Sequence, residues 1–353
     1  MKKILRFLLV LILVIVVAVG ALLGWLTATE FKPAPVEEME VDNGEGAHAL
    51  AGGEELRILS WNIGYGGLGK DSDFFMDGGK DARSADQPTV KQYLQGIAAT
   101  IAEHDPDLAL LQEVDINSSR TYSIDERDYL DTEMSTETYA LNYSCPFVPV
   151  PVPPIGKVNS GLFTLTDDLI VEHAQRQSLP CPFSWPLRIA NLKRCLLVSY
   201  LPIEGSDSQL VLINLHLEAY DDGEGKIAQT QQLRQFIQEE YRKGNYVIAG
   251  GDFNQTFPGS LEVYPILDPG FWTPGVLENE LLADGWRFAY DTAVPTCRLL
   301  NQPYDPSDTA HTQYYVIDGF MLSPNVEVKS VSTIDCGFEN SDHNPVELVV
   351  ELN

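Results

Sequence analysis

An apolar run near the start of the chain limits how its 353 residues can fold. Apart from Arg6, the run from Ile4 to Leu26 contains no charged residue. A helix needs only about 20 predominantly apolar residues to cross the hydrocarbon core of a membrane. Because Lys2 and Lys3 precede the run and glutamates follow it, the positive-inside rule predicts a cytoplasmic N-terminus. The sequence therefore predicts a single-pass plasma-membrane protein with the rest of the chain outside the cytoplasm.

A cleaved signal peptide is the main alternative for this run. The apolar part of a signal peptide is typically about 7 to 15 residues long, which is shorter than the run found here. Small residues at 18–20 and 27–29 would still permit cleavage. A buried core helix is disfavoured, because a basic cluster beside an uninterrupted apolar run is an export pattern. We therefore expect an uncleaved anchor, and its shortness and the simple composition suggest a bacterial source.

Three regions are expected along the chain: a basic start and transmembrane anchor at 1–30, a flexible tether at 31–55 and a folded domain at 56–353. The tether is rich in Pro, Gly, Ala and Glu and has no apolar periodicity, which is typical of a solvated linker. No internal repeat and no second linker divides the chain after Leu56. We therefore expect one α/β domain that extends to the C-terminus.

Within this domain, short β-type runs alternate with amphipathic stretches. The expected strands are at 57–61, 108–112, 196–201, 210–215, 246–249, 315–321 and 346–352. The expected helices are at 90–103 and 229–242, the first with apolar residues at helical spacing. Closely spaced prolines at 146–154 exclude helix and central strand and predict an extended surface loop. This loop either packs on its own domain or forms an apolar rim that touches lipid or substrate.

The chain is strongly acidic, with 51 Asp and Glu against 23 Lys and Arg and a net charge of −28. Such a balance repels nucleic acids, whose binding depends on Lys and Arg placed along the phosphate backbone. After the anchor, the chain has no basic run beyond the pair Lys193 and Arg194. A nucleic-acid partner is therefore disfavoured, although a local basic groove can coexist with a negative net charge of the whole chain.

The five cysteines, at positions 145, 181, 195, 297 and 336, include no C-x-x-C pair, so a structural zinc site is disfavoured. Export permits disulfides without proving them, and the odd number leaves at least one thiol unpaired within a monomer. Ordinary semi-buried cysteines and one or two bridges fit the sequence about equally well. The oligomeric state is left open.

Polar residues follow the ends of six predicted strands or turns, at the edge of an α/β sheet where ligands usually bind. These residues are Asn62, Glu113, His216, Asp252 with Asn254, Asp318, and Asp342 with His343. Taken singly, each fits a helix cap or an Asx-turn. Together they supply carboxylates, amides and two histidines, an oxygen-rich set suited to Mg²⁺, Mn²⁺ or Ca²⁺. We therefore expect a metal-dependent site rather than six unrelated structural roles.

The segments SWNIGYGG, LLQEVD, INLHLEA, GGDFNQT, VIDGFML and SDHNPV occur in this order between Leu56 and Asn353. They resemble the successive motifs of the endonuclease/exonuclease/phosphatase superfamily, which includes DNase-I-like nucleases, inositol-polyphosphate phosphatases and neutral sphingomyelinases. The resemblance implies a four-layered α/β sandwich with two mixed β-sheets, here preceded by one N-terminal transmembrane helix. It also implies hydrolysis of a phosphoester with Mg²⁺ or Mn²⁺ as cofactor.

The resemblance implies a metal site built from three residues. Glu113 resembles the principal metal ligand of the family, with Asn62 beside it holding metal or phosphate and Asp342 as a further ligand. Such a site is chemically reasonable, because a phosphoester repels hydroxide. A cation and protonated donors must neutralise its oxygens while a carboxylate or histidine takes a proton from water.

The resemblance also implies catalytic and substrate-binding roles. His216 matches a histidine that contacts the phosphate and that in nuclease members can act as an acid toward the leaving oxygen. Asp252 and Asn254 match the pair that orients or deprotonates the attacking water and holds the phosphate. His343 matches the histidine of the last motif, and Asp318 matches the acid that orients it, a pairing that fixes the tautomer of the histidine and stabilises its charged form.

The substrate is less well specified than the chemistry. Arg83, Asn159, Thr296 and Arg298 are weaker candidates for phosphate contacts, since surface ion pairs and turns explain them equally well. At Gly319 the sequence departs from the better-known phosphatase pattern, in which an aromatic residue often follows the aspartate. A position at the membrane makes phospholipid headgroups or phosphorylated metabolites the expected substrates. The alternatives are an extracellular nuclease and a non-catalytic module that binds a phospholipid or another partner.

Overall fold

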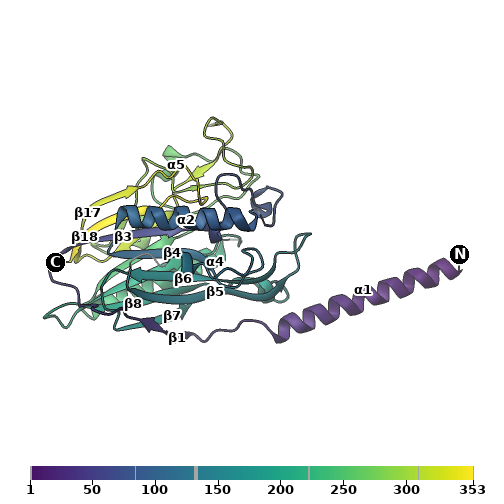
Figure 1. Cartoon of the computed structure of the whole chain (residues 1–353), viewed down its shortest axis with the longest axis horizontal. Helices are drawn as coiled ribbons and strands as arrows, with labels where there is room; N and C mark the ends of the chain where they lie inside the picture. The colour runs from purple at the N-terminus through teal and green to yellow at the C-terminus, as the bar shows by residue number, and fades with distance from the viewer. Residues whose placement is uncertain (1, 84, 131–133, 222, 309, 353) are drawn as a thin grey trace.

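Two large mixed β-sheets form the centre of the structure, and the computed structural model describes residues 2–83, 85–130, 134–221, 223–308 and 310–352 (Figure 1). The first sheet contains, in spatial order, β1 (Val36–Met39), β7 (His173–Ser178), β8 (Cys195–Pro202), β9 (Gln209–His216), β10 (Tyr246–Asp252), β16 (Asp318–Leu322) and β13 (Arg287–Ala289). The second contains β17 (Val326–Thr333), β18 (Val346–Leu352), β3 (Glu55–Asn62), β4 (Leu108–Asp115), β6 (Gly156–Thr166), β5 (Thr136–Val148) and β2 (Val41–Asp42). Each sheet mixes one parallel pair, β9 with β10 or β3 with β4, with antiparallel pairs.

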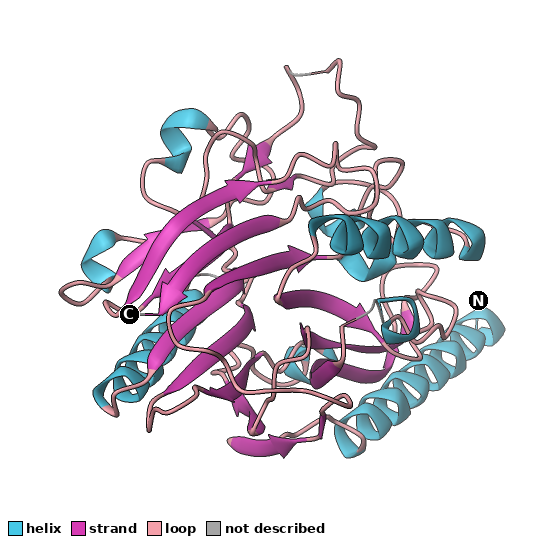
Figure 2. Cartoon of the chain, turned by 60° about the vertical axis from the view of Figure 1, so that its left-hand side comes forward, coloured by secondary structure: helices cyan, strands magenta, loops and turns pink. Residues whose placement is uncertain are grey.

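The two sheets pack face to face, and a helix covers the outer face of each. Ile58 and Leu348 of the second sheet share one buried cluster with Leu212 and Phe320 of the first. Side chains that alternate with these point outward. They pack against α2 (Gln87–His104) on the second sheet and α4 (Glu224–Arg242) on the first (Figure 2). The predicted four-layered α/β sandwich is therefore confirmed.

Both predicted helices are present, and each begins a few residues earlier than its apolar pattern indicated. In α2 the side chain of Asp86 accepts a hydrogen bond of 2.9 Å from the amide of Thr89 and so caps the first turn. Val90, Leu94 and Ile97, at helical spacing, are buried against the sheet. The sequence pattern thus marked the buried face of the helix but not its cap.

Some strands differ from the prediction. Among the strands that were not predicted are β5, β6, β7 and β17, because polar residues interrupt their apolar pattern. The segment predicted as one strand at 315–321 is divided between β15 (Tyr314–Tyr315), which pairs with β14 (Cys297–Arg298), and β16. At the division, the amides of Ile317 and Asp318 donate to the hydroxyl of Thr296 at 3.0 and 3.1 Å. A side chain thus replaces the strand partner at this point.

Shorter elements lie in the connections between the strands and helices of the two sheets. They are η1 (Gly64–Gly66), η2 (Phe75–Asp77), α3 (Arg127–Leu130), η3 (Leu187–Ala190), β11 (Gln255–Thr256), α5 (Ser260–Val263), β12 (Gly275–Val276) and η4 (Asn279–Leu281). The proline-rich segment also departs from the expectation of a loop over 146–154, since β5 continues to Val148 before the loop begins. Pro146 is tolerated there because the β5–β6 ladder is irregular between Cys145 and Val148.

The segment expected to be a solvated tether follows the edges of both sheets instead. β1 pairs with β7 of the first sheet and β2 pairs with β5 of the second. Leu50 is buried in the core between the sheets, and Met39 and Val41 pack against that core. These few apolar side chains are too widely spaced to form a periodic pattern, which explains why the sequence did not reveal the docking.

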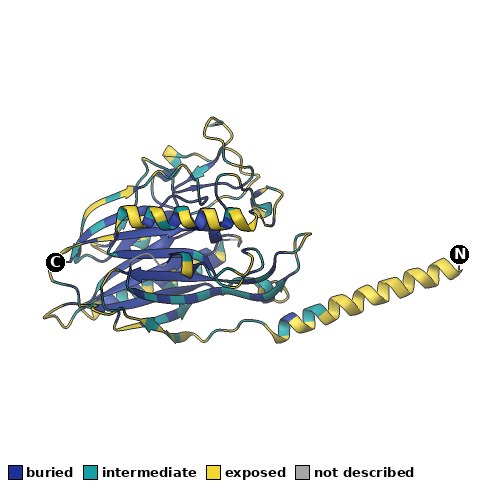
Figure 3. Ribbon diagram, in the orientation of Figure 1, coloured by how far each residue is buried: buried dark blue, intermediate teal, exposed yellow. Residues whose placement is uncertain are grey.

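The N-terminal run forms α1 (Lys2–Ala28), which is long and apolar enough to cross a membrane. A signal sequence near the N-terminus can also meet these criteria of length and composition. Its side chains are exposed until the last turns, where Leu26 is buried against the domain (Figure 3). The helix is therefore a candidate membrane span whose end belongs to the folded domain.

All five cysteines are free thiols. Cys145, Cys195 and Cys297 are buried and pack as small apolar residues, while Cys181 and Cys336 are partly exposed. Of the two alternatives left open by the sequence, the structure therefore shows semi-buried cysteines without a bridge.

Candidate functional site

The register of three strands brings together three predicted site residues at one end of the first sheet. Asp252, the last residue of β10, is paired with His216 of β9 on one side and with Asp318 of β16 on the other. All three side chains are buried. Because β9 and β10 are parallel, both end at the same edge of the sheet, where ligands bind in α/β folds.

Asn62 and Glu113 reach the same place from the second sheet. Asn62 ends β3 and is paired with Gln112 of β4. The ladder between β4 and β6 is interrupted between Leu111 and Val114, and Glu113 adopts a left-handed backbone conformation with φ of 58°. A β-bulge changes the direction of a side chain. A positive φ at a residue other than glycine is a strained conformation that is found mostly at functional sites. Here Nδ2 of Asn62 donates to Oε1 of Glu113 at 3.2 Å.

His343 is held through both its backbone and its ring. Its carbonyl accepts a hydrogen bond of 2.8 Å from Nε1 of Trp61, and its Nδ1 lies 2.8 Å from Oδ2 of Asp318. Burial alone would lower the pKa of His343, but Asp318, followed by Cys297 and Asp342, raises that pKa well above its ordinary value. These carboxylates therefore favour the protonated form of the imidazole, whose Nε2 is directed to Asp252.

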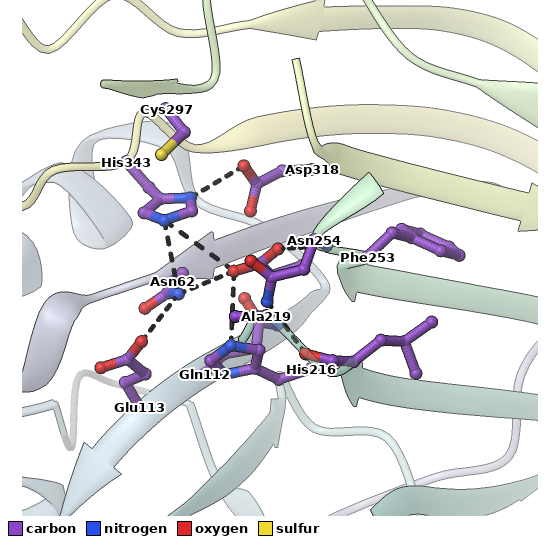
Figure 4. A network of polar contacts seen from close by, with 12 residues as sticks. Asn62, Gln112, Glu113, His216, Ala219, Phe253, Asn254, Cys297, Asp318 and His343 are labelled. Atoms are coloured by element: carbon purple, nitrogen blue, oxygen red, sulfur yellow. Dashed lines mark hydrogen bonds and ion pairs between the residues drawn. The ribbon is translucent and has the colours of Figure 1, made fainter. Parts of the chain in front are cut away.

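Asp252 is the centre of the polar network. Figure 4 shows Asn62, His216 and His343 of this network. Oδ2 of Asp252 accepts a hydrogen bond of 3.0 Å from Nδ2 of Asn62 and lies 3.5 Å from Nε2 of His216 and 3.8 Å from Nε2 of His343. Its Oδ1 accepts a hydrogen bond of 2.8 Å from the amide of Asn254. One carboxylate thus contacts groups from both sheets and from the last predicted motif.

Two carboxyl groups of the site have raised pKa values. Burial, with a contribution from Asp318, raises the pKa of Asp252 to about 7, and burial also raises that of Asp342 to about 7. The unfolded chain releases these protons near pH 4, at about the ordinary pKa of an aspartate. Between about pH 4 and 7 the folded state binds more protons, so the contribution of these groups to the free energy of unfolding falls as the pH rises. A nearby cation would relieve this cost.

His216 has the opposite electrostatic character. Burial, together with the positive charges of Arg194 and His343, lowers the pKa of His216 well below its ordinary value. Its imidazole is therefore neutral, and its Nδ1 has no hydrogen-bond partner among the described residues. A neutral imidazole donates one N–H and accepts at its other nitrogen without carrying charge.

Residues 59–343 match the model described as the Endonuclease/Exonuclease/phosphatase family. The chain belongs to this family. Its members are typically hydrolases of phosphoester bonds, so the match agrees with the chemistry of the polar network. No curated protein matches the chain.

Solved structures share the fold at low sequence identity. A functionally unknown conserved protein from Enterococcus faecalis has a TM-score of 0.55 and 16% identity, with 84% of this chain and 100% of that chain covered. An endonuclease/exonuclease/phosphatase from Beutenbergia cavernae has a TM-score of 0.52 and 16% identity, covering 85% and 72% of the two chains. The human Nocturnin catalytic domain, solved with a bound sulfate anion, has a TM-score of 0.51 and 16% identity, covering 89% and 98%.

Family enzymes commonly use divalent metals, and the residues at this site fit a hard cation. Glu113 and Asp342 face the same cavity and offer carboxylate oxygens, the ligands that such a cation prefers. The hydroxyl of Tyr65 and Oδ1 of Asp318 are buried without a hydrogen-bond partner among the described residues, which is unusual unless something else binds there. The amide of Asn62 turns its nitrogen toward Glu113 while its oxygen accepts from Gly64, so its predicted role as a metal ligand requires the amide to turn.

The four weaker candidates are placed differently from one another. Arg298 lines the cavity that contains the polar network. Arg83 instead donates to the carbonyl of Ile155 at 2.9 Å, the side chain of Asn159 accepts from a serine of β5, and Thr296 holds the start of β16. Of the four residues, Arg298 alone lines the cavity, and its guanidinium donates to backbone carbonyls at 2.9 and 3.2 Å.

The departure from the family pattern at Gly319 has a packing reason. A Cβ atom at this position would lie 2.8 Å from Cζ of Phe257 and 2.9 Å from the carbonyl oxygen of Ala289. The adjacent strand and this ring leave no room for a side chain. The glycine thus reflects the local packing of β16 rather than a change at the site itself.

Several residues that line the cavity were not predicted. Tyr65 is buried beneath the guanidinium of Arg120, whose carbon lies 3.5 Å from the ring centroid. Two nitrogens of this guanidinium donate hydrogen bonds to the carboxylate of Asp115. Tyr220 donates to Asp77 at 2.9 Å, and burial raises the pKa of Asp77 to about 6. Tyr65 lies inside the motif SWNIGYGG and was therefore within reach of sequence analysis. The other residues carry no recognisable local pattern.

Proposed function

We propose that this chain hydrolyses phosphoester bonds with Mg²⁺ or Mn²⁺ as a cofactor. The observation that carries the proposal is the convergence on Asp252 of an amide donor and the two histidines His216 and His343 at 3.0, 3.5 and 3.8 Å. A carboxyl group whose pKa is near 7 is well suited to act as a base at neutral pH. Donors arranged around it before the reaction stabilise the charge that develops on a phosphoryl group.

Each residue of the network has a role in this proposal. Asp252 takes a proton from the attacking water as the water oxygen bonds to phosphorus and the ester oxygen departs. Protonated His343 gives the proton on Nε2 to the departing oxygen. The proton that Asp252 took from water then passes to His343. His216 is neutral and so holds a phosphoryl oxygen through its N–H rather than acting as the acid, while Asn254 positions Asp252. A divalent cation held by Glu113 and Asp342 would neutralise phosphoryl charge.

The test is hydrolysis of bis-p-nitrophenyl phosphate and p-nitrophenyl phosphate by the full chain in detergent micelles. We expect release of p-nitrophenol with Mg²⁺ or Mn²⁺, loss of release in EDTA and recovery when the metal is returned, because a divalent cation is needed to neutralise phosphoryl charge beside the carboxylates of the network. The preferred substrate decides between diester and monoester. Turnover that persists in EDTA would refute the metal requirement. Absence of turnover by a protein that binds the metal would favour a non-catalytic binding module.

We also propose that α1 remains as an anchor and that the catalytic domain lies on the outer side of the membrane. The basic residues before α1 and the acidic residues after it support this orientation. Added protease should therefore remove the domain from intact cells that express the full chain. Protection of the domain until the cells are lysed would reverse the orientation, and release of the domain into the medium would show that α1 is a cleaved signal.

A further inference from the structure

One cavity of about 640 Å³ is lined both by the polar network and by the last turns of α1. Asp252 and His343 contribute polar groups to its surface. Leu23 and Leu26 of α1 contribute apolar side chains, and Ile189 of η3 adds to the same wall. The candidate membrane helix is therefore part of the wall of the site.

The end of α1 is packed onto the domain. Leu26 lies in a buried cluster with Val148 of β5 and Ile189. Next to it, Nε1 of Trp185 donates to Oγ1 of Thr27 at 3.1 Å. In Figure 1, α1 leaves the domain on the side where the connection between β5 and β6 projects. The helix thus holds this face of the domain at a defined position relative to a membrane.

Ion pairs strengthen this attachment. The side chain of Glu30, two residues beyond α1, is only 2% exposed. Its Oε1 lies 3.1 Å from Nε of Arg188 and 3.4 Å from Nζ of Lys193. A buried carboxylate is costly to separate from its partners. The segment after α1 is therefore fixed rather than free to swing the domain away from the bilayer.

Large apolar side chains are exposed around the same end of the cavity. We call Met76, Val150, Val152, Trp185 and Leu187 the apolar rim; Val152 is 94% exposed and Leu187 is 66% exposed. Met76, Val150 and Leu187 also line the cavity. Exposed apolar residues that gather in one place usually mark a contact with a membrane or a partner, and Trp is enriched at membrane interfaces. Because the rim adjoins the end of α1, the contact that it fits is the bilayer surface.

We propose that the substrate is a membrane phospholipid, whose headgroup enters the cavity from the bilayer while its acyl chains remain along the apolar rim and the end of α1. This inference rests on the proposed function. A small soluble phosphoester would need only the polar part of the cavity, whereas an apolar wall that continues to a membrane helix matches the hydrocarbon part of a lipid. Water adds across one P–O ester bond of the lipid: its oxygen bonds to phosphorus, and its proton reaches the departing alcohol through Asp252 and His343.

The experiment uses the full chain in nanodiscs made of equal parts of phosphatidylcholine, phosphatidylethanolamine and phosphatidylglycerol, with Mn²⁺. Phospholipid loss is measured by mass spectrometry, and bis-p-nitrophenyl phosphate is assayed in the same samples. The variants are Leu187→Asp and Val150→Asp, which place a charge in the apolar wall without touching the polar network. Val263→Asp, at an apolar residue of α5 that is 50% exposed and does not line the cavity, is the matched control.

We expect the wild type to consume phospholipid, and each rim variant to do so at least about tenfold more slowly, because a charge excludes acyl chains from the wall. Hydrolysis of the soluble diester should stay within about twofold of the wild type in all variants, since the polar network is intact. Equal lipid hydrolysis by the rim variants would overturn the proposal, as would turnover of the soluble diester without any loss of phospholipid. Absence of turnover of both substrates by the wild type would refute the proposed function itself.

Discussion

Replacing His343 with alanine is expected to lower kcat for bis-p-nitrophenyl phosphate by about 10²- to 10⁴-fold, the usual contribution of a positioned acid or base. The variant loses the proton carried on Nε2 beside Asp252, and it leaves Asp318 without the partner that lies 2.8 Å away. Because an unpaired buried carboxylate also destabilises the fold, His343→Gln is the better variant for kinetics. Its amide can still donate to Asp318 but has no proton to give to a leaving group. The measurement is steady-state hydrolysis together with a thermal unfolding curve.

His311→Ala is the matched control for this prediction. The side chain of His311 is 77% exposed and pairs with Asp308 on the surface. Its removal should change neither kcat nor thermal stability appreciably, because exposed ion pairs contribute little. Full activity in His343→Gln would contradict the proposed proton transfer and would leave His343 with a structural role only.

Replacing Glu113 with glutamine is expected to weaken Mn²⁺ binding by at least about 10-fold, since even residues behind the metal ligands have effects of this size. A neutral amide of nearly the same shape removes one full charge from the metal site. Isothermal titration calorimetry at pH 8 measures the affinity under conditions where Asp252 and Asp342, whose pKa values are about 7, are ionised. The same variant should lose hydrolysis of bis-p-nitrophenyl phosphate, with partial recovery at high Mn²⁺ concentration.

Glu103→Gln provides the control for the metal measurement. Glu103 is exposed near the end of α2, and its replacement removes the same charge at a distance from the cavity. Metal affinity should be unchanged in this variant. If Glu113→Gln bound Mn²⁺ as tightly as the wild type, the cation would have to bind elsewhere, for example at one of two clusters that include His343, with Asp252 and Asp318 or with Cys297 and Asp342.

Most of the polar network could be predicted from the sequence, because its residues follow directly after apolar strands. Asp252 ends an otherwise apolar strand, and in a sheet of this kind such a residue lies at the edge where parallel strands end. The same argument applies to Asn62 at the end of β3 and to His216 at the end of β9. The pairing of Asp318 with His343 was predicted only through the resemblance to a family, since the two residues are 25 positions apart.

Other features depend on contacts between distant segments. The positive φ of Glu113 comes from the bulge between β4 and β6, which no local residue pattern announces. β1 and β2 form only because β7 and β5 present free edges to them. Burial raises the pKa of Asp252 and lowers the pKa of His216, because burial disfavours the charged form of each group.

By itself, the sequence determined the candidate membrane helix, the α/β class of the fold and the identity of the polar residues, since these depend on apolar runs and strand periodicity. The two-sheet sandwich was implied by the resemblance of the ordered motifs to a family. The tertiary structure alone decided that the end of α1 is packed onto the domain and lines the same cavity as Asp252 and His343. The physical reason is that local patterns report which side chains must be buried or charged. Which distant side chains share one cavity depends on how the sheets, the loops and the helix pack together.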